Sequence, residues 1–171
     1  MPDAYAGDRG DPTVPKSSYK LLFDAYYLKL MSGGGSVLQA WHARSGKPVA
    51  KMFDYTPARQ TLAGHGPIPE GEYWIRPDQM SSKPGALDKY FRDAWPEAGW
   101  GNFRVIIHPY PKTVTYGRGG MFIHGGAVWG SAGCVDLTYG IDSFAARVAS
   151  VRNQFIPLTV AYNGTTTVPP P

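Results

Sequence analysis

Residues 19–43 read YKLLFDAYYLKLMSGGGSVLQAWHA, and this stretch favours a β-sheet over a helix. Two runs rich in apolar residues, 19–25 and 26–31, are followed by three consecutive glycines and by a third run over 36–43. In the third run the two-residue period of a strand places Val37, Gln39 and Trp41 on one face. We therefore expect three consecutive strands joined by tight turns.

The remainder of the chain continues this pattern. Further strands are expected over residues 71–76, 103–108, 121–124 and 155–162, with a short helix around 86–94 and a clearer one over 140–153. The 21 glycines and 16 prolines among 171 residues favour turns and short strands. The predicted fold class is mainly β (β-rich α+β), a mixed β-sheet body with one or two helices. We expect a flexible arm over residues 1–18, one catalytic domain over 19–162 and a tail over 163–171.

Composition excludes several classes of protein. A single cysteine excludes an intrachain disulfide framework and a cysteine-based zinc cluster. The 17 basic and 13 acidic residues give a net charge of +4, but no run of four basic residues supports nucleic-acid binding. No window of 18 apolar residues predicts a membrane span. The N-terminal residues lack the basic and apolar regions of a signal peptide, so export is expected to need another carrier.

The segment most suited to chemistry is GRGGMFIHGGAVWGSAGCVDL, residues 117–137. It contains the only cysteine, Cys134, and places His124 ten residues before it, with seven glycines in the same stretch. A nucleophilic thiolate needs a base within hydrogen-bond reach and a lowered pKa, and a strand–loop–strand return would bring the imidazole to the sulfur. Gly133 would let main-chain N–H groups face a developing oxyanion. The alternative is that Cys134 is a small buried hydrophobic residue without a catalytic role.

The same residues resemble the active-site signature of the L,D-transpeptidase (YkuD-type) family. His124-Gly125 is similar to the early His-Gly element, and Ser131-Ala132-Gly133-Cys134 is similar to the Ser-His-Gly-Cys block. Upstream, residues 66–73, GPIPEGEY, resemble a turn of that fold. Three features depart from the pattern: Ala132 replaces the histidine, Asp136 replaces the arginine after the cysteine, and the spacing is shorter. This variant resembles the branch of type VI-secreted, L,D-transpeptidase-like effectors.

The resemblance implies cysteine acyl transfer on peptidoglycan stem peptides. Cys134 would attack the third residue of a tetrapeptide stem and expel the terminal D-Ala, with His124 as base. Water or a free D-amino acid would then resolve the thioester. Ser131 would hold the loop or His124, and the main chain at Gly133 and Cys134 would form the oxyanion site.

Substrate binding is expected from four further residues. Arg118 would bind the carboxylate of the stem, because Asp136 occupies the position of the family's usual arginine. Tyr116, Gly125 and Trp129 would line the groove. Asp136 is expected to satisfy the main chain or an arginine, and the residues expected to be structural or to lie at the surface are His42, His65 and His108.

These inferences lead to one principal function and two alternatives. The principal reading is an antibacterial effector, an L,D-carboxypeptidase or D-amino-acid exchange enzyme that acts in the periplasm of a target bacterium. Its expected partners are peptidoglycan stem peptides, an immunity protein and type VI secretion components, and we expect no metal and no cofactor. One alternative is a glycan-binding module without catalysis. The other is a cysteine amidase that cuts another bond of the stem, although such folds usually place cysteine before histidine in the chain.

Overall fold

A computed structural model describes residues 9–82 and 101–171 of the chain. The strands within these ranges are β1 (Lys20–Phe23), β2 (Tyr27–Met31), β3 (Val37–His42), β4 (Arg44–Ser45), β5 (Phe53–Asp54), β6 (Gly71–Ile75), β7 (Ser81–Ser82), β8 (Phe103–Ile106), β9 (His108–Pro109), β10 (Phe122–His124), β11 (Val135–Asp136), β12 (Ile156–Val160) and β13 (Thr167–Val168). The helical segments are α1 (Pro57–Gln60), η1 (Pro77–Gln79), η3 (Thr138–Gly140), α3 (Ile141–Val148) and η4 (Ala149–Val151). The β-rich α+β class predicted from the sequence is confirmed.

The larger sheet begins with the three strands expected between residues 19 and 43. Its order is β3-β2-β1-β12-β6-β9, in which β1, β2 and β3 pair antiparallel and β12 lies parallel to β1. The turn between β1 and β2 forms because the carboxylate of Asp24 accepts hydrogen bonds from the N–H groups of Tyr26 and Tyr27. The turn before β3 contains Gly35 at a φ of 92°, a left-handed conformation that glycine adopts without strain.

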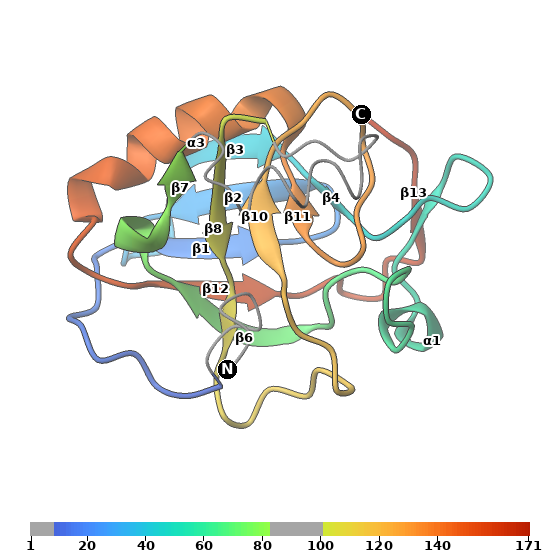
Figure 1. The fold of residues 1–171 in the computed structure, drawn as a ribbon, viewed down its shortest axis with the longest axis horizontal. Coiled ribbons are helices and arrows are strands. Elements are labelled where there is room, and N and C mark those ends of the chain that lie inside the picture. Colours follow the sequence, from blue (N-terminus) through green and yellow to red (C-terminus); the bar gives the residue numbers. More distant parts are fainter. Residues whose placement is uncertain (1–8, 83–100) are drawn as a thin grey trace.

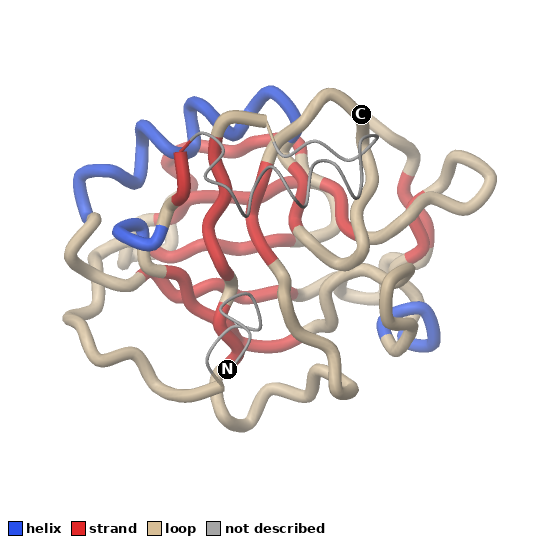
Figure 2. Tube along the Cα trace, viewed as in Figure 1, coloured by secondary structure: helices blue, strands red, loops and turns tan. Residues whose placement is uncertain are grey.

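The smaller sheet lies against the larger one and carries the candidate site. Its order is β4-β11-β10-β8-β7, with β10 and β11 parallel. Figure 1 shows its strands running across those of the larger sheet, while helix α3 follows one border of the molecule. Figure 2 shows the loops that join these strands as the tan segments. Buried apolar side chains fill the core, among them Leu21, Phe23, Val105, Ile123 and Val135.

The register of the strand pairs determines which side chains of the smaller sheet point into the core and which point away from it. Val105 pairs with Ile123, and Ile123 pairs with Val135, so these three core residues share one face. Successive side chains in a strand alternate between faces. The neighbouring residues on the three strands therefore lie together on the opposite face. That face is where the candidate catalytic residues are found.

Two sequence predictions are corrected in detail. The expected strand over 103–108 is divided between the sheets, because β8 belongs to the smaller sheet and β9 pairs with β6 in the larger one. The expected helix over 140–153 is α-helical only from Ile141 to Val148 and continues as the 3₁₀ segment η4. Within α3, Ile141, Phe144 and Val148 are buried. The short helix expected around residues 86–94 lies outside the described residues.

The chain on both sides of the predicted domain packs against it. Ser17 donates from its main-chain N–H to Phe155 O, and the indole of Trp74 donates to Gly10 O. These contacts connect Gly10 and Ser17, which lie in the expected arm, to the domain. At the other end, β13 pairs with β5, so the tail over 163–171 contributes a strand. None of the helices described is both long and apolar enough to span a membrane.

Candidate active site

Cys134 and His124 lie next to each other on the outer face of the smaller sheet. His124 is the last residue of β10, and Cys134 directly precedes β11. The parallel register pairs His124 with Asp136, so Cys134, two residues before Asp136, shares this face. The loop over residues 125–134 connects the two strands. The sheet register thus brings together the two residues on which the sequence prediction depends.

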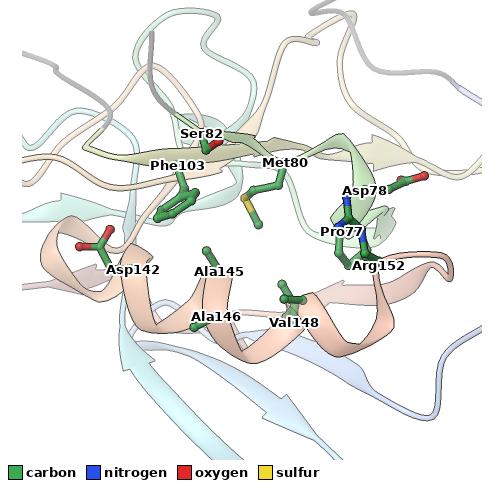
Figure 3. Close-up of a pocket in the computed structure, with 11 residues that line it drawn as sticks. Pro77, Asp78, Met80, Ser82, Phe103, Asp142, Ala145, Ala146, Val148 and Arg152 are labelled. Carbon is green, nitrogen blue, oxygen red and sulfur yellow. The ribbon is translucent and has the colours of Figure 1, made fainter.

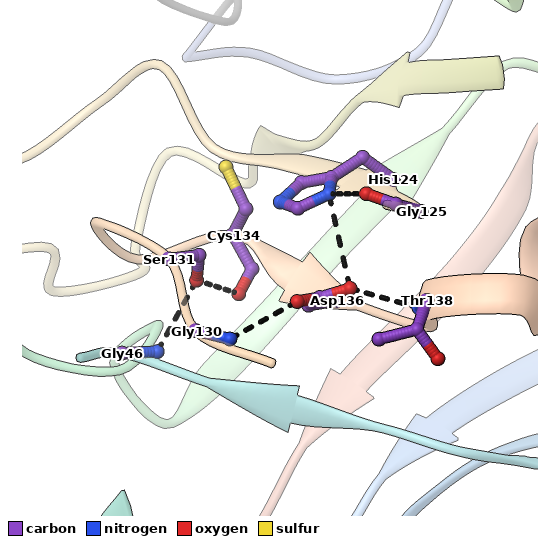
Figure 4. Close-up of polar contacts among 8 residues, drawn as sticks. All are labelled: Gly46, His124, Gly125, Gly130, Ser131, Cys134, Asp136 and Thr138. Carbon is purple, nitrogen blue, oxygen red and sulfur yellow. Dashed lines mark hydrogen bonds and ion pairs between the residues drawn. The ribbon is translucent and has the colours of Figure 1, made fainter. Parts of the chain in front are cut away.

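His124 is held in one orientation by the main-chain carbonyl of the next residue, Gly125. Its Nδ1 lies 2.6 Å from Gly125 O, which can only accept a hydrogen bond, and this assigns the proton to Nδ1. Nε2 is then the unprotonated nitrogen, and Figure 4 shows this edge of the ring turned toward Cys134. Burial lowers the pKa of His124 to about 4, with a smaller contribution from the charge of Arg104. The imidazole is therefore a neutral base at pH 7.

The thiol of Cys134 is also neutral at rest. Burial raises its pKa to about 11, and the charge of Asp136 acts in the same direction. A main-chain contact with Phe122 and the charges of Arg104 and Arg118 oppose this shift only in part. The lowered thiol pKa expected from the sequence is thus wrong for the resting protein. Chemistry at this site requires transfer of the thiol proton to His124 during the attack.

Ser131 anchors the loop that carries Cys134. Its hydroxyl donates to Cys134 O at 2.8 Å and accepts a hydrogen bond from the N–H of Gly46 at 3.3 Å (Figure 4). The main-chain N–H of Ser131 also donates to Gly46 O at 3.0 Å. Of the two roles expected for Ser131, the structure places it in the one that holds the loop.

Arg118 occupies a different place from the one expected. It is 8% exposed, and its Nη1 donates to Gln60 O and Pro67 O, both at 2.6 Å. Nη2 donates to Gly66 O at 2.8 Å and to Ala132 O at 3.4 Å. Both terminal nitrogens are therefore satisfied by main-chain carbonyls. Arg118 thus joins the loop before β6 to the loop of Cys134, and its binding of a substrate carboxylate stays a prediction.

Gly133 is required where Arg118 crosses the loop. Its φ is 126°, and a Cβ atom there would lie 2.5 Å from Arg118 Nη2. Gly125 is restricted as well, since a Cβ atom would lie 2.3 Å from Ile141 Cγ2. Both glycines of the motif thus have a packing reason. Of the other two expected groove residues, Trp129 packs partly buried against the core, and Tyr116 is exposed.

Asp136 is the site residue to which the sequence prediction gave too little weight. Its carboxylate is fully buried and lies 4.0 Å from His124 Nδ1. It accepts hydrogen bonds from the N–H of Gly130 at 3.1 Å and of Thr138 at 2.8 Å (Figure 4). Burial raises its pKa to about 7 despite these bonds. The two-residue spacing from Cys134 was the available signal, because it puts both side chains on one face of a strand.

The remaining histidines lie away from the Cys134–His124 pair. His42 and His65 are exposed, whereas His108 is buried, stacks on Trp74 with ring centroids 4.1 Å apart and lies 2.7 Å from Gln79 Oε1. Across residues 9–82 and 101–171, no group of three or more His, Cys, Asp or Glu side chains is placed to hold a metal ion.

A groove lies beside helix α3, on the other face of the small sheet. Figure 3 shows α3 on one side of it and Phe103 and Met80 on the other. Phe103 precedes Arg104 in β8, so its side chain points away from the face that carries His124. Asp78, Asp142 and Arg152 line the groove as well. The groove is thus separated from the candidate active site.

Comparison with known proteins identifies related sequences and folds. A sequence family described as the Tlde1 domain matches residues 41–158. A search of curated proteins gives no match. The structure of Bd1075 from Bdellovibrio bacteriovorus is similar with a TM-score of 0.54 and 15% identity, covering 95% of this chain and 54% of that one. The helical cell shape determining protein Pgp2 from Campylobacter jejuni is similar with a TM-score of 0.51 and 16% identity, covering 93% of this chain and 54% of that one.

These structural likenesses establish a shared fold. The chain spans about half the length of each of these two solved structures. The match to the Tlde1 domain, in contrast, is a match of sequence and covers more than half of the chain, including His124 and Cys134.

Proposed function

Because the chain belongs to the Tlde1 domain family, which is associated with type VI effectors and is L,D-transpeptidase-like, we propose that it is a peptidoglycan-modifying cysteine acyl-transfer enzyme. Its substrate would be the stem tetrapeptide, and its reaction L,D-carboxypeptidase cleavage, D-amino-acid exchange or both. The observation that carries this proposal is the arrangement of His124. Its Nδ1 proton is bound by Gly125 O, and its basic Nε2 faces Cys134.

The first half of the reaction follows from this geometry. His124 Nε2 takes the thiol proton as Cys134 Sγ attacks the carbonyl carbon of the third stem residue. The tetrahedral intermediate collapses, the C–N bond breaks, and the imidazolium returns the proton to the leaving amine of D-Ala. A thioester remains on Cys134. The developing oxyanion would be stabilised by main-chain N–H groups at Gly133 and Cys134.

The second half restores the thiol. Water, or the amine of a free D-amino acid, attacks the thioester carbonyl and gives up a proton to His124 Nε2. The C–S bond then breaks and the proton passes to the departing sulfur. The products are a tripeptide with a new carboxylate, or a tetrapeptide with an exchanged terminal residue.

Asp136 would support the imidazolium that forms in each half. Its buried carboxyl group lies 4.0 Å from Nδ1, and when it is ionised its negative charge favours protonated histidine. The two main-chain N–H donors that bind Asp136 fix its position when it is ionised. It would act as a positioning residue, because it lies near Nδ1 of His124, whereas the substrate would react at Nε2.

Delivery to a target cell is the second part of the proposal. Association of the Tlde1 domain with type VI effectors supports secretion and action on the cell wall of another bacterium. We propose action in the periplasm of that bacterium, with an immunity protein and secretion components as partners. Export-tagged protein should harm a Gram-negative host, and untagged protein should not, because the substrate lies outside the inner membrane.

The reaction is tested with purified tetrapeptide muropeptides, incubated with and without D-Met and analysed by mass spectrometry. We expect loss of D-Ala alone, or replacement of D-Ala by D-Met. Cys134→Ala and His124→Ala should each abolish turnover, because nucleophile and base act as a unit. The matched control is His42→Ala, since His42 is exposed. Wild-type turnover by folded Cys134→Ala would contradict the proposal, whereas loss of a dipeptide or a whole stem would identify an amidase.

A further inference from the structure

The loop of Cys134 has its carbonyl groups engaged and its N–H groups free. Cys134 O accepts from the hydroxyl of Ser131, and Ala132 O accepts from Nη2 of Arg118. The main-chain N–H groups of Gly133 and Cys134, in contrast, form no hydrogen bond with the part of the chain that the structure describes. Buried N–H groups are nearly always paired in folded proteins, and Gly133 is buried. Two unpaired donors beside a nucleophile are available to an oxyanion of the substrate.

Ala132 and Gly133 share one peptide group, whose two polar ends point in opposite directions. The peptide bond is trans, so the C=O of Ala132 and the N–H of Gly133 are antiparallel. A group that holds this carbonyl therefore also sets the direction of the N–H. Gly133 has a φ of 126°, and the conformational freedom of glycine lets such a peptide rotate easily. A restraint from outside the loop is needed to keep one orientation.

Arg118 provides this restraint. Its Nη2 donates to Ala132 O at 3.4 Å, and a Cβ atom on Gly133 would lie 2.5 Å from the same nitrogen, so the guanidinium lies against this peptide. Three shorter hydrogen bonds, of 2.6, 2.6 and 2.8 Å, hold the guanidinium to the carbonyl groups of Gln60, Pro67 and Gly66. A planar guanidinium with several bonds has a fixed direction. The loop before β6 thus forms the frame against which the Ala132–Gly133 peptide is oriented.

The positive charge of Arg118 is buried near Cys134 without an ion-pair partner among the described carboxylates. Burial lowers the pKa of the guanidinium, and the groups whose charges oppose this shift are Tyr73, Tyr162 and the thiol of Cys134. An arginine nevertheless stays protonated at physiological pH. Buried charges usually have a partner of opposite sign. Here negative charge arises only when the reaction creates it beside Cys134.

We propose that Arg118 holds the carbonyl of Ala132 and thereby directs the N–H of Gly133 toward the oxyanion that forms when Cys134 attacks the substrate. This inference deepens the proposed function and rests on it. Arg118 does not touch the reacting atoms, so it is a positioning residue. Its bond to the carbonyl also polarises the peptide and makes the N–H a stronger donor.

The role differs from binding of a substrate carboxylate, because the oxyanion exists only during the reaction. Formation of the thioester and its attack by water or an amine each pass through a tetrahedral oxyanion. The contribution of Arg118 should therefore appear in kcat, whereas a contact with the bound substrate that is equal in the ground and transition states would appear in KM.

The test compares release of D-Ala from the tetrapeptide stem with alkylation of Cys134 by iodoacetamide. Release passes through an oxyanion, whereas alkylation occurs at a saturated carbon and forms none. Arg118→Met should lower kcat by about tenfold to a hundredfold and change KM by less than about threefold. The alkylation rate should fall by a much smaller factor than kcat. Arg118→Lys should restore part of kcat, because an ammonium keeps the charge but lacks the fork of donors.

Two controls keep the comparison interpretable. Arg147→Met changes an arginine on the exposed side of α3 and should leave release and alkylation unchanged. Thermal unfolding shows which variants are folded at the assay temperature. If Arg118→Met is unfolded there, Arg118→Lys decides the question, and its kcat should fall by a larger factor than its alkylation rate.

The outcomes separate the inference from the function it rests on. Wild-type kcat in the folded Arg118 variant would overturn the inference and leave the enzyme proposal intact. Equal losses of kcat and alkylation rate would also overturn it, because Arg118 would then only hold Cys134 in place. A higher KM at unchanged kcat would indicate binding of the substrate carboxylate instead. Absence of D-Ala release by the wild-type protein would overturn the proposed function and this inference together.

Discussion

The thiol of Cys134 and the imidazole of His124 share an environment that disfavours charge on either group. Burial raises the pKa of the thiol to about 11 and lowers that of the imidazole to about 4. A preformed thiolate–imidazolium pair would need the opposite order of these two values. The resting site is therefore a neutral pair, and its reactivity depends on proton transfer during attack.

The pH dependence of alkylation tests this order. Only the thiolate reacts with iodoacetamide, so a thiol with a pKa of about 11 should react about tenfold faster for each pH unit between roughly pH 7 and 9. The expected rate at neutral pH is lower than that of an exposed thiol. Labelling is followed by mass spectrometry, with Cys134→Ser as the unlabelled control. A rate that stays level from acidic to neutral pH would instead demonstrate a preformed ion pair.

At the scale of elements, the loop between β10 and β11 sets the position of the nucleophile. Ser131 connects this loop to Gly46 by two hydrogen bonds and to Cys134 O by a third. Gly46 directly follows β4, which pairs with β11. The loop is therefore tied to the strand next to the one that it enters, and this limits how far Cys134 can move relative to His124.

Ser131→Ala tests the contribution of this anchor. The change removes the hydroxyl's two hydrogen bonds and should lower the free energy of unfolding by about 1–3 kcal/mol. Release of D-Ala should fall by roughly tenfold, because a small displacement of a catalytic group reduces the rate strongly. Chemical denaturation and the muropeptide assay measure the two effects. Ser150→Ala is the exposed control, and unchanged turnover in a destabilised Ser131→Ala protein would exclude a role of the loop in positioning.

At the scale of the whole molecule, segments far apart in the chain complete each other's sheets. Strand β12 pairs with β1 on one side and with β6 on the other, so the end of the chain supplies an interior strand of the larger sheet. Strand β13 then pairs with β5, and Arg44 of β4 donates to Pro169 O. Because β4 pairs with β11, the C-terminal residues support the sheet that holds Asp136.

Val168→Ala tests whether the C-terminal strand is part of the folded unit. Val168 is fully buried, and truncation of a buried aliphatic side chain should lower the free energy of unfolding by about 1–3 kcal/mol. Val128 is 61% exposed, so Val128→Ala should change the free energy of unfolding by less than about 0.5 kcal/mol. Thermal or denaturant unfolding measures both variants. Equal stability of the two would mean that residues 163–171 behave as the free tail first expected.

Local patterns were sufficient for much of the fold and for the two central residues of the candidate site. Alternating apolar residues and the turn at Gly33–Gly35 predicted β1 to β3, because strand period and turn chemistry depend on neighbours in sequence. His124 and Cys134 could be predicted because one histidine and the single cysteine occur together in a short glycine-rich segment. Both lie within ten residues of each other, and the chemistry of each is visible in its residue type.

The placement of the arginines and of Asp136 was decided by tertiary structure. Whether a guanidinium near the motif is exposed or bound to carbonyls depends on residues about 50 to 60 positions away, as the contacts of Arg118 with Gln60, Gly66 and Pro67 show. Arg104 is 20 residues from His124 in sequence and becomes its neighbour only through the register of β8 with β10. The pKa values of the site likewise follow from burial, which arises when separate strands pack and has no counterpart in the local sequence.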